Sequence, residues 1–456
     1  MSIIQDLFPG ATIPNVDYGM LQSAIERQLR LESLQPVGTY VAKIIQLFET
    51  MLVRHGVMVV GLTLTGKTTC HATLAAALTQ LKRDGEESSQ YEVAKRHTLN
   101  PKSVAMGELY GEVNQVTQEW TDGLVPTLVR MAINDDSDNF NWVCFDGPVD
   151  AIWIENMNTV LDDNKMLCLS NGERMKLAKG MHMLFEVNDL SVASPATVSR
   201  CGMVFMEAVY IGHAPYIKTW CESYLATKLP DEADRLFALL TKHCSSAIKF
   251  VREECREGTE SVDANLLIAC FRMLEATLKA EHGVNPNKAG VKTMINLWFI
   301  FSFVWAFGGN LHEESRAKFD GYVRDSGLIK ELDPSFPEAG TVFDYCVSPE
   351  RGGFVSWASI TPTFSYDPEQ PYFNILVPTG ENTTYNFLLR VLVANNSHVM
   401  LVGETGTGKS VMVQGFLKRL PENAGSIQAA FSAQVGSSRC TAITTATPPP
   451  HPRHTP

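Results

Sequence analysis

The chain has 456 residues, of which 45% are hydrophobic and 19% are charged. That balance is ordinary for a globular protein and excludes a chain that is disordered throughout. The formal net charge of -12 argues against a nucleic-acid-binding face, which needs clustered lysine and arginine. The length suffices for about three average domains.

Cysteine usage and hydropathy indicate the compartment. The ten cysteines contain no Cys-x-x-Cys pair, and most lie in apolar runs, as Cys144 and Cys270 do. They are therefore expected to be buried thiols of a reducing compartment. The N-terminal residues do not form a signal peptide, and the most apolar window, residues 295–307, is too short to span a bilayer. These features predict a soluble cytoplasmic protein with no membrane contact and a buried helix at that window.

The first part of the chain leads into a short buried strand. Residues 1–20 contain Pro9, Gly10 and Pro14 and are expected to be irregular. Apolar residues at helical spacing predict helices over residues 21–34 and 38–52. The apolar run at residues 57–60 is typical of a strand that is buried in a parallel sheet.

The eight residues after that strand fit the pattern Gly-x-x-x-x-Gly-Lys-Ser/Thr. They are Gly61, Leu62, Thr63, Leu64, Thr65, Gly66, Lys67 and Thr68. Backbone N–H groups in such a loop surround phosphate oxygens, and the following helix points its positive end at the same anion. Lys67 is expected to reach the β- and γ-phosphates, and the Thr68 hydroxyl to hold Mg²⁺. The alternative is a glycine-rich turn with an incidental lysine, which the flanking strand and helix patterns argue against.

An acidic residue follows at a second strand. After a plausible strand at residues 91–97 and a short helix at 124–132, residues 141–146 form an apolar run that ends in Asp146. Ligands bind at the carboxyl ends of parallel strands, where this carboxylate can hold a Mg²⁺ water. Many strands end in Asp, so the inference depends on the phosphate loop about 80 residues earlier.

Two further polar residues are candidates for the same site. The apolar strand at residues 181–187 ends at Asn188, which either orients a water or the γ-phosphate, or simply begins a turn. Arg200 is the only basic residue other than histidine between Lys179 and Lys218, and it lies just before a strand at residues 203–206. It is either a solvated loop arginine or a functional cation.

Strand patterns stop near residue 210 and helical patterns take their place. The predicted helices are residues 214–226, 231–256, 262–281, 286–307 and 313–324. The sequence therefore predicts a helical subdomain after an α/β subdomain. Residues 331–374 are rich in proline, glycine and aromatic residues and are expected to form an irregular linker.

The phosphate-loop pattern occurs a second time, after a predicted helix at residues 382–394 and an apolar run at 399–402. Its residues are Gly403, Glu404, Thr405, Gly406, Thr407, Gly408, Lys409 and Ser410, with Ser410 as the metal-binding hydroxyl. This second copy ends early, because the Thr/Pro-rich residues 435–456 cannot build a core and are expected to be disordered.

These segments together resemble a dynein heavy chain, specifically an axonemal one. The most specific stretch is residues 145–158, Phe-Asp-Gly-Pro-Val-Asp-Ala-Ile-Trp-Ile-Glu-Asn-Met-Asn, with further likeness at 106–111, 119–123 and 198–203. The resemblance covers roughly residues 1–434 and corresponds to the second AAA+ module and the start of the third. Residues 62–65 depart from the Pro- and Gly-rich loop interior that is more usual in the family.

The resemblance implies a fold and a set of domains. The fold is an α/β P-loop NTPase with a parallel sheet, flanking helices and a helical small subdomain, followed by a truncated second module. The implied domains are a large α/β subdomain (1–210), a helical small subdomain (211–330), an entry segment (331–374), the start of the next module (375–434) and a disordered tail (435–456).

The resemblance also implies a function in an ATP-driven motor ring that moves along microtubules in cilia and flagella. Leu7 and Phe8 would contact adenine in the first site, and Leu376 and Val377 in the second. Asn188 would be the sensor residue, and Arg200 a finger that reaches the nucleotide of the preceding module. The expected cofactors are ATP or ADP with Mg²⁺.

The implied partners are the other AAA+ modules of the ring. Dynein intermediate and light chains and microtubules would bind through regions that this chain lacks, and the expected location is the cytoskeleton of the ciliary axoneme.

Whether this chain is itself an enzyme depends on the residue after Asp146. Active AAA+ sites have a glutamate there to polarise the attacking water, whereas this chain has Gly147. The sequence therefore favours a first site that binds nucleotide with little or no hydrolysis. An active tandem ATPase and a non-enzymatic binding fragment are the alternatives, and a P-loop kinase or small GTPase is a remote one.

Overall fold

The computed structural model describes residues 18–86, 88–114, 116–286, 288, 290–333, 335–366, 377–420 and 425–427. Leu7, Phe8, Leu376 and the predicted disordered tail, residues 435–456, lie outside the described residues. The chain divides into two compact units, residues 1–250 with 261–268, and residues 251–260 with 269–456.

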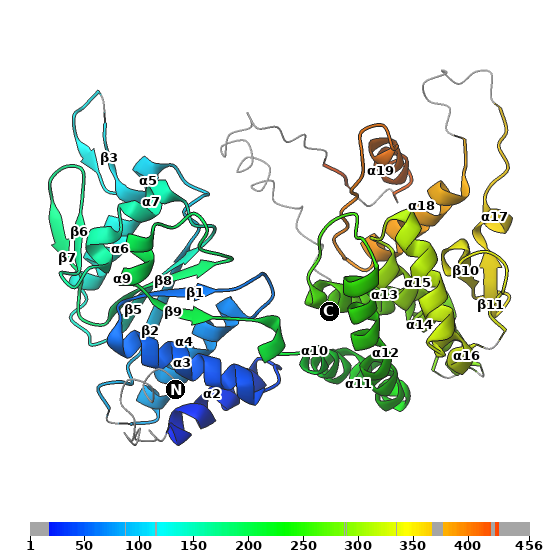
Figure 1. Ribbon diagram of the computed structural model, residues 1–456, viewed down its shortest axis with the longest axis horizontal. Helices are drawn as coiled ribbons and strands as arrows, with labels where there is room; N and C mark the ends of the chain where they lie inside the picture. The colour runs from blue at the N-terminus through cyan, green and yellow to red at the C-terminus, as the bar shows by residue number, and fades with distance from the viewer. Residues whose placement is uncertain are drawn as a thin grey trace, which may run out of the picture. The chain divides into compact units, whose positions relative to one another are not determined.

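The first unit is built on a five-stranded sheet in which all paired strands are parallel (Figure 1). The strand order is β2 (Ala94–Leu99), β5 (Phe140–Asp146), β8 (Met181–Val187), β1 (Gly56–Val60) and β9 (Gly202–Phe205). β1 is buried along its whole length, as its unbroken apolar run predicts for a strand covered on both faces. The predicted parallel α/β sheet is confirmed.

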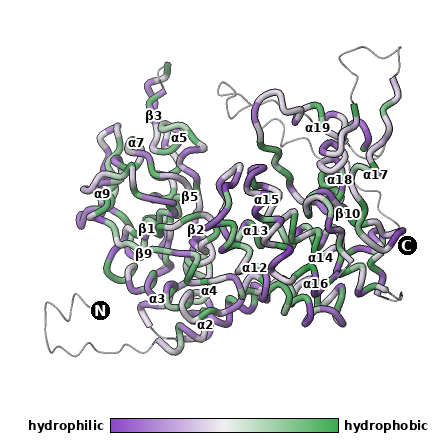
Figure 2. Tube along the Cα trace, turned by 45° about the vertical axis from the view of Figure 1, so that its right-hand side comes forward, coloured by the Kyte–Doolittle hydropathy of each residue, from purple (hydrophilic) through white to green (hydrophobic). Residues whose placement is uncertain are grey.

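Helices cover both faces of this sheet. One face packs against α2 (Gly19–Leu31), α3 (Gly38–Val53) and α4 (Lys67–Arg83). The other packs against α5 (Met106–Tyr110), α6 (Leu124–Ile133), α7 (Ala151–Glu155) and α8 (Asn158–Leu161). Figure 2 shows both hydrophobic and hydrophilic residues along α2, α3 and α4, as expected for helices with one buried face.

Short elements complete the first unit. The hairpins β3 (Glu112–Val113) with β4 (Trp120–Thr121) and β6 (Met166–Cys168) with β7 (Arg174–Lys176) extend from the loops. The helix α9 (Pro195–Arg200) precedes β9, and α10 (Ala214–Trp220) and α11 (Ala226–Lys228) follow it, joined by a π-helical turn at Cys221–Leu225. The stretch at residues 100–121 therefore contains the helix α5 and a hairpin.

The predicted helical region is confirmed. Its helices include α12 (Ala233–Glu254), α13 (Asp263–Thr277), α14 (Val291–Gly308), α15 (Glu313–Asp325) and the short α16 (Leu328–Leu332). α14 is long and apolar enough to cross a membrane, but its residues from Met294 to Gly308, apart from Asn296, are buried in the protein, as in a core helix. The predicted helical start at residue 286 is wrong, because the helix begins at Val291, after Gly290 in the left-handed region.

The predicted irregular linker holds some regular structure. It contains the antiparallel pair β10 (Tyr345–Ser348) and β11 (Gly353–Ser356), followed by α17 (Trp357–Ile360). α18 (Gly380–Ala394) and α19 (Lys409–Leu417) then flank the second phosphate loop. The apolar run at residues 399–402, which resembles the run before the first loop, forms no strand, because no described strand lies beside it to supply hydrogen-bond partners.

Candidate functional site

The first phosphate loop joins β1 to α4 at the carboxyl edge of the sheet. The Gly61 N–H donates to Val187 O at 3.0 Å, which fastens the start of the loop to β8. A Cβ at Gly61 would lie 2.1 Å from Met206 O, so only glycine fits. Gly66 has φ +83°, and a Cβ there would lie 2.9 Å from the Tyr40 ring. Both glycines of the motif are therefore required by contacts and by backbone conformation.

Lys67 folds back across this loop. Its ammonium donates to Gly61 O at 2.6 Å and to Leu62 O at 2.8 Å. Burial lowers its pKa, while the negative charges of Glu186 and Asp146 act in the opposite direction. The ammonium thus lies at the mouth of the loop, where a phosphate can replace the two carbonyls as its partner.

The loop and the start of α4 have the donors that a nucleotide phosphate needs. Cys70 N–H is the first amide in this stretch to bond along the helix, to Gly66 O at 2.8 Å. The earlier amides at the helix start have no intrahelical partner and can bind an anion. Together with the Lys67 ammonium and the Thr68 hydroxyl, they form a donor set that suits Mg-nucleotide.

Asp146 and Asn188 lie at the ends of neighbouring strands. Asp146 is the last residue of β5, is exposed, and is in register with Glu186 on β8. Asn188 directly follows β8 and is exposed, one residue after the strand residue that accepts from Gly61. The structure therefore brings both predicted polar residues to the same sheet edge as the phosphate loop.

Glu186 is a residue of this site that the sequence analysis missed. It is 4% exposed, and its two carboxylate oxygens accept hydrogen bonds from Thr68 Oγ1 and His71 Nε2, each at 2.6 Å. Burial by itself would raise the pKa of Glu186, but the hydrogen bonds from His71 and Thr68 outweigh it and hold the pKa below its usual value. The signal that could have identified Glu186 from the sequence is that it is the one acidic residue inside the apolar strand at residues 181–187.

Tyr40 is a second residue that the sequence analysis missed. Its side chain comes from α3, is buried, and donates to Gly66 O at 2.7 Å. Tyr216 of α10 donates to Leu64 O at 2.9 Å, so the loop is held from two sides. Leu64 has φ +65°, an unfavourable conformation for a residue with a branched side chain, and these contacts help to hold it there.

The residues that could replace the missing catalytic glutamate have other partners or are exposed. Asp150 caps α7 by accepting from Ile152 N at 2.8 Å and forms an ion pair with Lys102. Glu155, at the end of the same helix, is exposed. A Cβ on Gly147 would lie 2.9 Å from Asn100 Oδ1, so a side chain there requires Asn100 to move.

Arg200 is paired inside its own unit. Its guanidinium forms an ion pair with Asp162 and donates to Ala196 O at 3.0 Å. Its side chain is 32% exposed, so it is only partly available to a neighbouring molecule. In this conformation it is anchored at the end of α9.

The second phosphate loop repeats the local contacts of the first. Lys409 Nζ donates to Gly403 O at 2.7 Å and to Glu404 O at 2.5 Å, and Gly408 has φ +82°. Thr407 Oγ1 donates to Glu404 O at 2.9 Å, as Thr65 Oγ1 does to Leu62 O at 2.8 Å. Thr405, Gly406 and Ser410 complete the loop, and Val377, predicted to contact adenine, is exposed.

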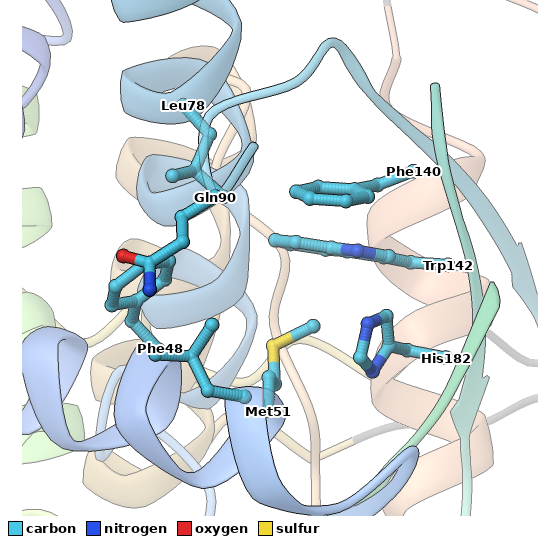
Figure 3. Close-up of a pocket in the computed structure, with 8 residues that line it drawn as sticks. Phe48, Met51, Leu78, Gln90, Phe140, Trp142 and His182 are labelled. Atoms are coloured by element: carbon cyan, nitrogen blue, oxygen red, sulfur yellow. The ribbon is translucent and has the colours of Figure 1, made fainter. Parts of the chain in front are cut away.

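A small cavity lies at the other end of the strands and is not a nucleotide site (Figure 3). Phe140, Trp142 and His182, near the starts of β5 and β8, face Phe48 and Met51 of α3. Trp142 Nε1 and His182 Nδ1 have no hydrogen-bond partner in the described chain, and burial lowers the pKa of His182 to about 4. The cavity, about 30 Å³, has room for a water molecule or two.

Four protein families match the chain in sequence. Residues 56–201 match the AAA domain of the dynein-related subfamily, and residues 235–359 match the dynein heavy chain AAA lid domain. Residues 364–447 match the P-loop containing dynein motor region. Residues 1–68 match the hydrolytic ATP binding site of dynein motor region, a match that ends at Thr68 and does not reach Asp146.

Individual relatives are similar over nearly the whole chain. Human dynein axonemal heavy chain 6 is 44% identical over 442 residues, which are 96% of this chain and 11% of the relative. Mouse dynein axonemal heavy chain 2 is 39% identical over 97% of this chain and 10% of its own length. The 1-beta heavy chain of the flagellar inner arm I1 complex of Chlamydomonas reinhardtii is 36% identical, with 96% and 10% covered. The chain thus spans about a tenth of the length of these relatives.

Proposed function

The chain belongs to the dynein heavy chains as a segment of an axonemal motor region with ATP-binding AAA domains, and from that premise we propose that its first site binds Mg-ATP and hydrolyses it slowly or not at all. The observation that carries the proposal is Gly147 directly after Asp146. Lys67 supplies charge for the phosphates, and Thr68 and Asp146 supply oxygens for Mg²⁺. These groups suffice for binding.

Hydrolysis needs one group more. A general base that orients and polarises water is worth roughly 10²–10⁴ in rate. Gly147 has no side chain, Asp150 is held by Lys102, and Glu186 accepts from Thr68 and His71. The site therefore acts as a structural nucleotide-binding site. We expect its ATP turnover to be well below about 1 s⁻¹, the low end of ordinary enzyme rates.

The test is single-turnover hydrolysis of ATP by the full chain, with Lys67→Ala as the binding control. Retention of ATP without turnover supports the proposal, and turnover near 1 s⁻¹ or faster overturns it. Gly147→Glu should restore hydrolysis only when Asn100 makes room, because the new Cβ would lie 2.9 Å from Asn100 Oδ1. The informative variant is therefore Gly147→Glu combined with Asn100→Ala, with Asn100→Ala alone as its control.

The finer domain and site assignments belong to the same proposal. We propose the domain boundaries 1–210, 211–330, 331–374, 375–434 and 435–456, with Leu7, Phe8, Leu376 and Val377 at adenine and Asn188 as sensor. Ser410 would hold Mg²⁺ in the second site once the strands of a complete module surround that loop. The whole motor would move along microtubules in the axoneme, with its other AAA+ modules, light chains and intermediate chains as partners.

Arg200 requires a conformational step if it is to act on a neighbouring module. An arginine supplied in trans can be worth about 10³–10⁵ in rate, but this one is paired with Asp162. We propose that docking of the preceding module exchanges Asp162 for a phosphate. In a complete ring, Arg200→Ala should slow turnover at the preceding module and leave binding at Lys67 intact. Unchanged ring turnover would make Arg200 a structural ion-pair partner only.

A further inference from the structure

Glu186 has both of its oxygens committed to groups on α4. It is the next-to-last residue of β8, the strand that lies between β1 and β5 in the sheet, and it is almost completely buried. One oxygen accepts from Thr68 Oγ1 and the other from His71 Nε2, each at 2.6 Å. Thr68 and His71 are three residues apart on α4, so they lie on the same side of that helix. A buried carboxylate is stable only when it is fully paired, and here it is.

The contact of the second ring nitrogen of His71, Nδ1, fixes the tautomer of the imidazole. Its Nδ1 lies 3.2 Å from the Arg96 guanidinium on β2. A guanidinium can only donate, so Nδ1 accepts, and the ring proton sits on Nε2, where it is donated to Glu186. The chain of donors therefore runs from Arg96 through His71 to Glu186, and Thr68 donates to the same carboxylate. All four side chains lie in the first unit.

This arrangement determines what the Thr68 hydroxyl can offer to a metal. A hydroxyl has one proton and two lone pairs. With its proton directed at Glu186, the lone pairs of Oγ1 are free for a cation. Without an acceptor there, the hydroxyl can rotate and direct its proton elsewhere. Ser410, the equivalent residue of the second loop, has no such acceptor among the described residues.

We propose that Glu186 is a positioning residue for magnesium, which orients the Thr68 hydroxyl and is itself held by His71 and Arg96. The inference rests on the proposed function, because it concerns Mg²⁺ that arrives with the nucleotide. Glu186 acts through Thr68 and touches neither nucleotide nor reacting atoms. Asp146, its neighbour in register on β5, remains the carboxylate for the metal water.

A positioning role has a distinct signature in binding. Outer-shell partners of a metal ligand typically contribute 10- to 100-fold in metal affinity. Glu186→Gln should therefore lower the magnesium enhancement of nucleotide binding by roughly 10-fold or more. The affinity measured without magnesium should stay within about twofold or tighten, because a negative charge near the phosphates is removed. A purely structural role would weaken both affinities in parallel.

The experiment titrates the full chain with a fluorescent methylanthraniloyl-ATP, once with excess magnesium chloride and once with EDTA. The variants are Glu186→Gln, Glu186→Asp, Thr68→Ala and the Glu186→Gln/Thr68→Ala double variant. Glu186→Asp keeps the charge but withdraws the oxygens from Thr68, so it tests the same contact if the glutamine variant does not fold. The double variant should lose no more enhancement than Thr68→Ala alone, because both changes remove one interaction.

Glu92→Gln is the matched control. Glu92 is also a buried carboxylate of the first unit, and it pairs with Lys82 at 2.9 Å. It should lower thermal stability without changing the magnesium enhancement. Equal loss in magnesium and in EDTA, or no loss in any folded Glu186 variant, would overturn the inference and leave the proposed function standing. Failure of the wild-type chain to bind under either condition would overturn both.

Discussion

The two phosphate loops have the same local conformation in different surroundings. In both, the motif lysine donates to the first two carbonyls of the loop, and the glycine before it has φ near +82°. The first loop follows a strand that is buried throughout, whereas Met400 and Val402 before the second are 84% and 58% exposed. The motif thus specifies the loop and the start of the helix, and neighbouring strands supply the rest of the site.

The comparison predicts that only the first loop is a binding site in this chain. Lys67→Ala should weaken binding of methylanthraniloyl-ATP by about 100-fold or more, since it removes a charge-assisted contact to phosphate. Lys409→Ala, the matched control, should leave the affinity and a stoichiometry of about one nucleotide per chain unchanged. Isothermal titration calorimetry measures both. A second equivalent of bound nucleotide that disappears with Lys409→Ala would show that the second loop is competent.

The same difference should appear in susceptibility to protease. Trypsin requires locally unfolded backbone, and the exposed segment around the second loop has little to hold it. Cleavage after Lys409 and Lys418 is expected to be at least about tenfold faster than cleavage after Lys67. Mass spectrometry of a digestion time course gives the order. Equal rates would mean that the sheet does not protect the first loop, and a resistant core extending past residue 434 would contradict the predicted disordered tail.

Tyr40 supports the first loop, and no described tyrosine donates to the equivalent carbonyl of the second loop. Tyr40→Phe removes the hydroxyl that donates to Gly66 O and leaves that carbonyl without this donor. The expected loss is about 1 kcal/mol in the free energy of unfolding, measured by urea denaturation, with weaker nucleotide binding. Tyr345→Phe is the control, because it removes a tyrosine-to-carbonyl bond at an exposed position. A larger loss of unfolding free energy in Tyr345→Phe than in Tyr40→Phe would indicate that burial of the Tyr40 hydrogen bond does not determine its contribution to stability.

The smallest expected effect concerns the loop interior. Leu64 has φ +65°, and the equivalent residue of the second loop is Gly406 with φ +90°. A left-handed conformation disfavours a non-glycine residue by roughly 1–2 kcal/mol, and glycine adds roughly 0.5–1 kcal/mol of unfolded-state entropy. Leu64→Gly should therefore stabilise the chain by about 0.5 kcal/mol in thermal unfolding. Destabilisation by more than about 1 kcal/mol would mean that the Leu64 side chain packs in a way that its 37% exposure does not suggest.

Local sequence determined the features that depend on neighbouring residues alone. The pattern from Gly61 to Thr68 determined the loop and the start of the helix, because glycine conformations and the lysine contacts span only a few residues. The apolar run at residues 181–187 predicted β8 with its observed bounds for the same reason. The family resemblance extended this to the fold, and the parallel sheet and helical region agree with it.

Tertiary structure decided the features that join distant residues. The contacts of Glu186 with Thr68 and His71 connect positions more than 100 residues apart, and no local pattern encodes their meeting. The pairing of Arg200 with Asp162 and the support of Gly66 by Tyr40 are of the same kind. The run at residues 399–402 resembles the one at 57–60 but forms no strand, because a strand exists only through hydrogen bonds to a neighbour that the run itself cannot supply.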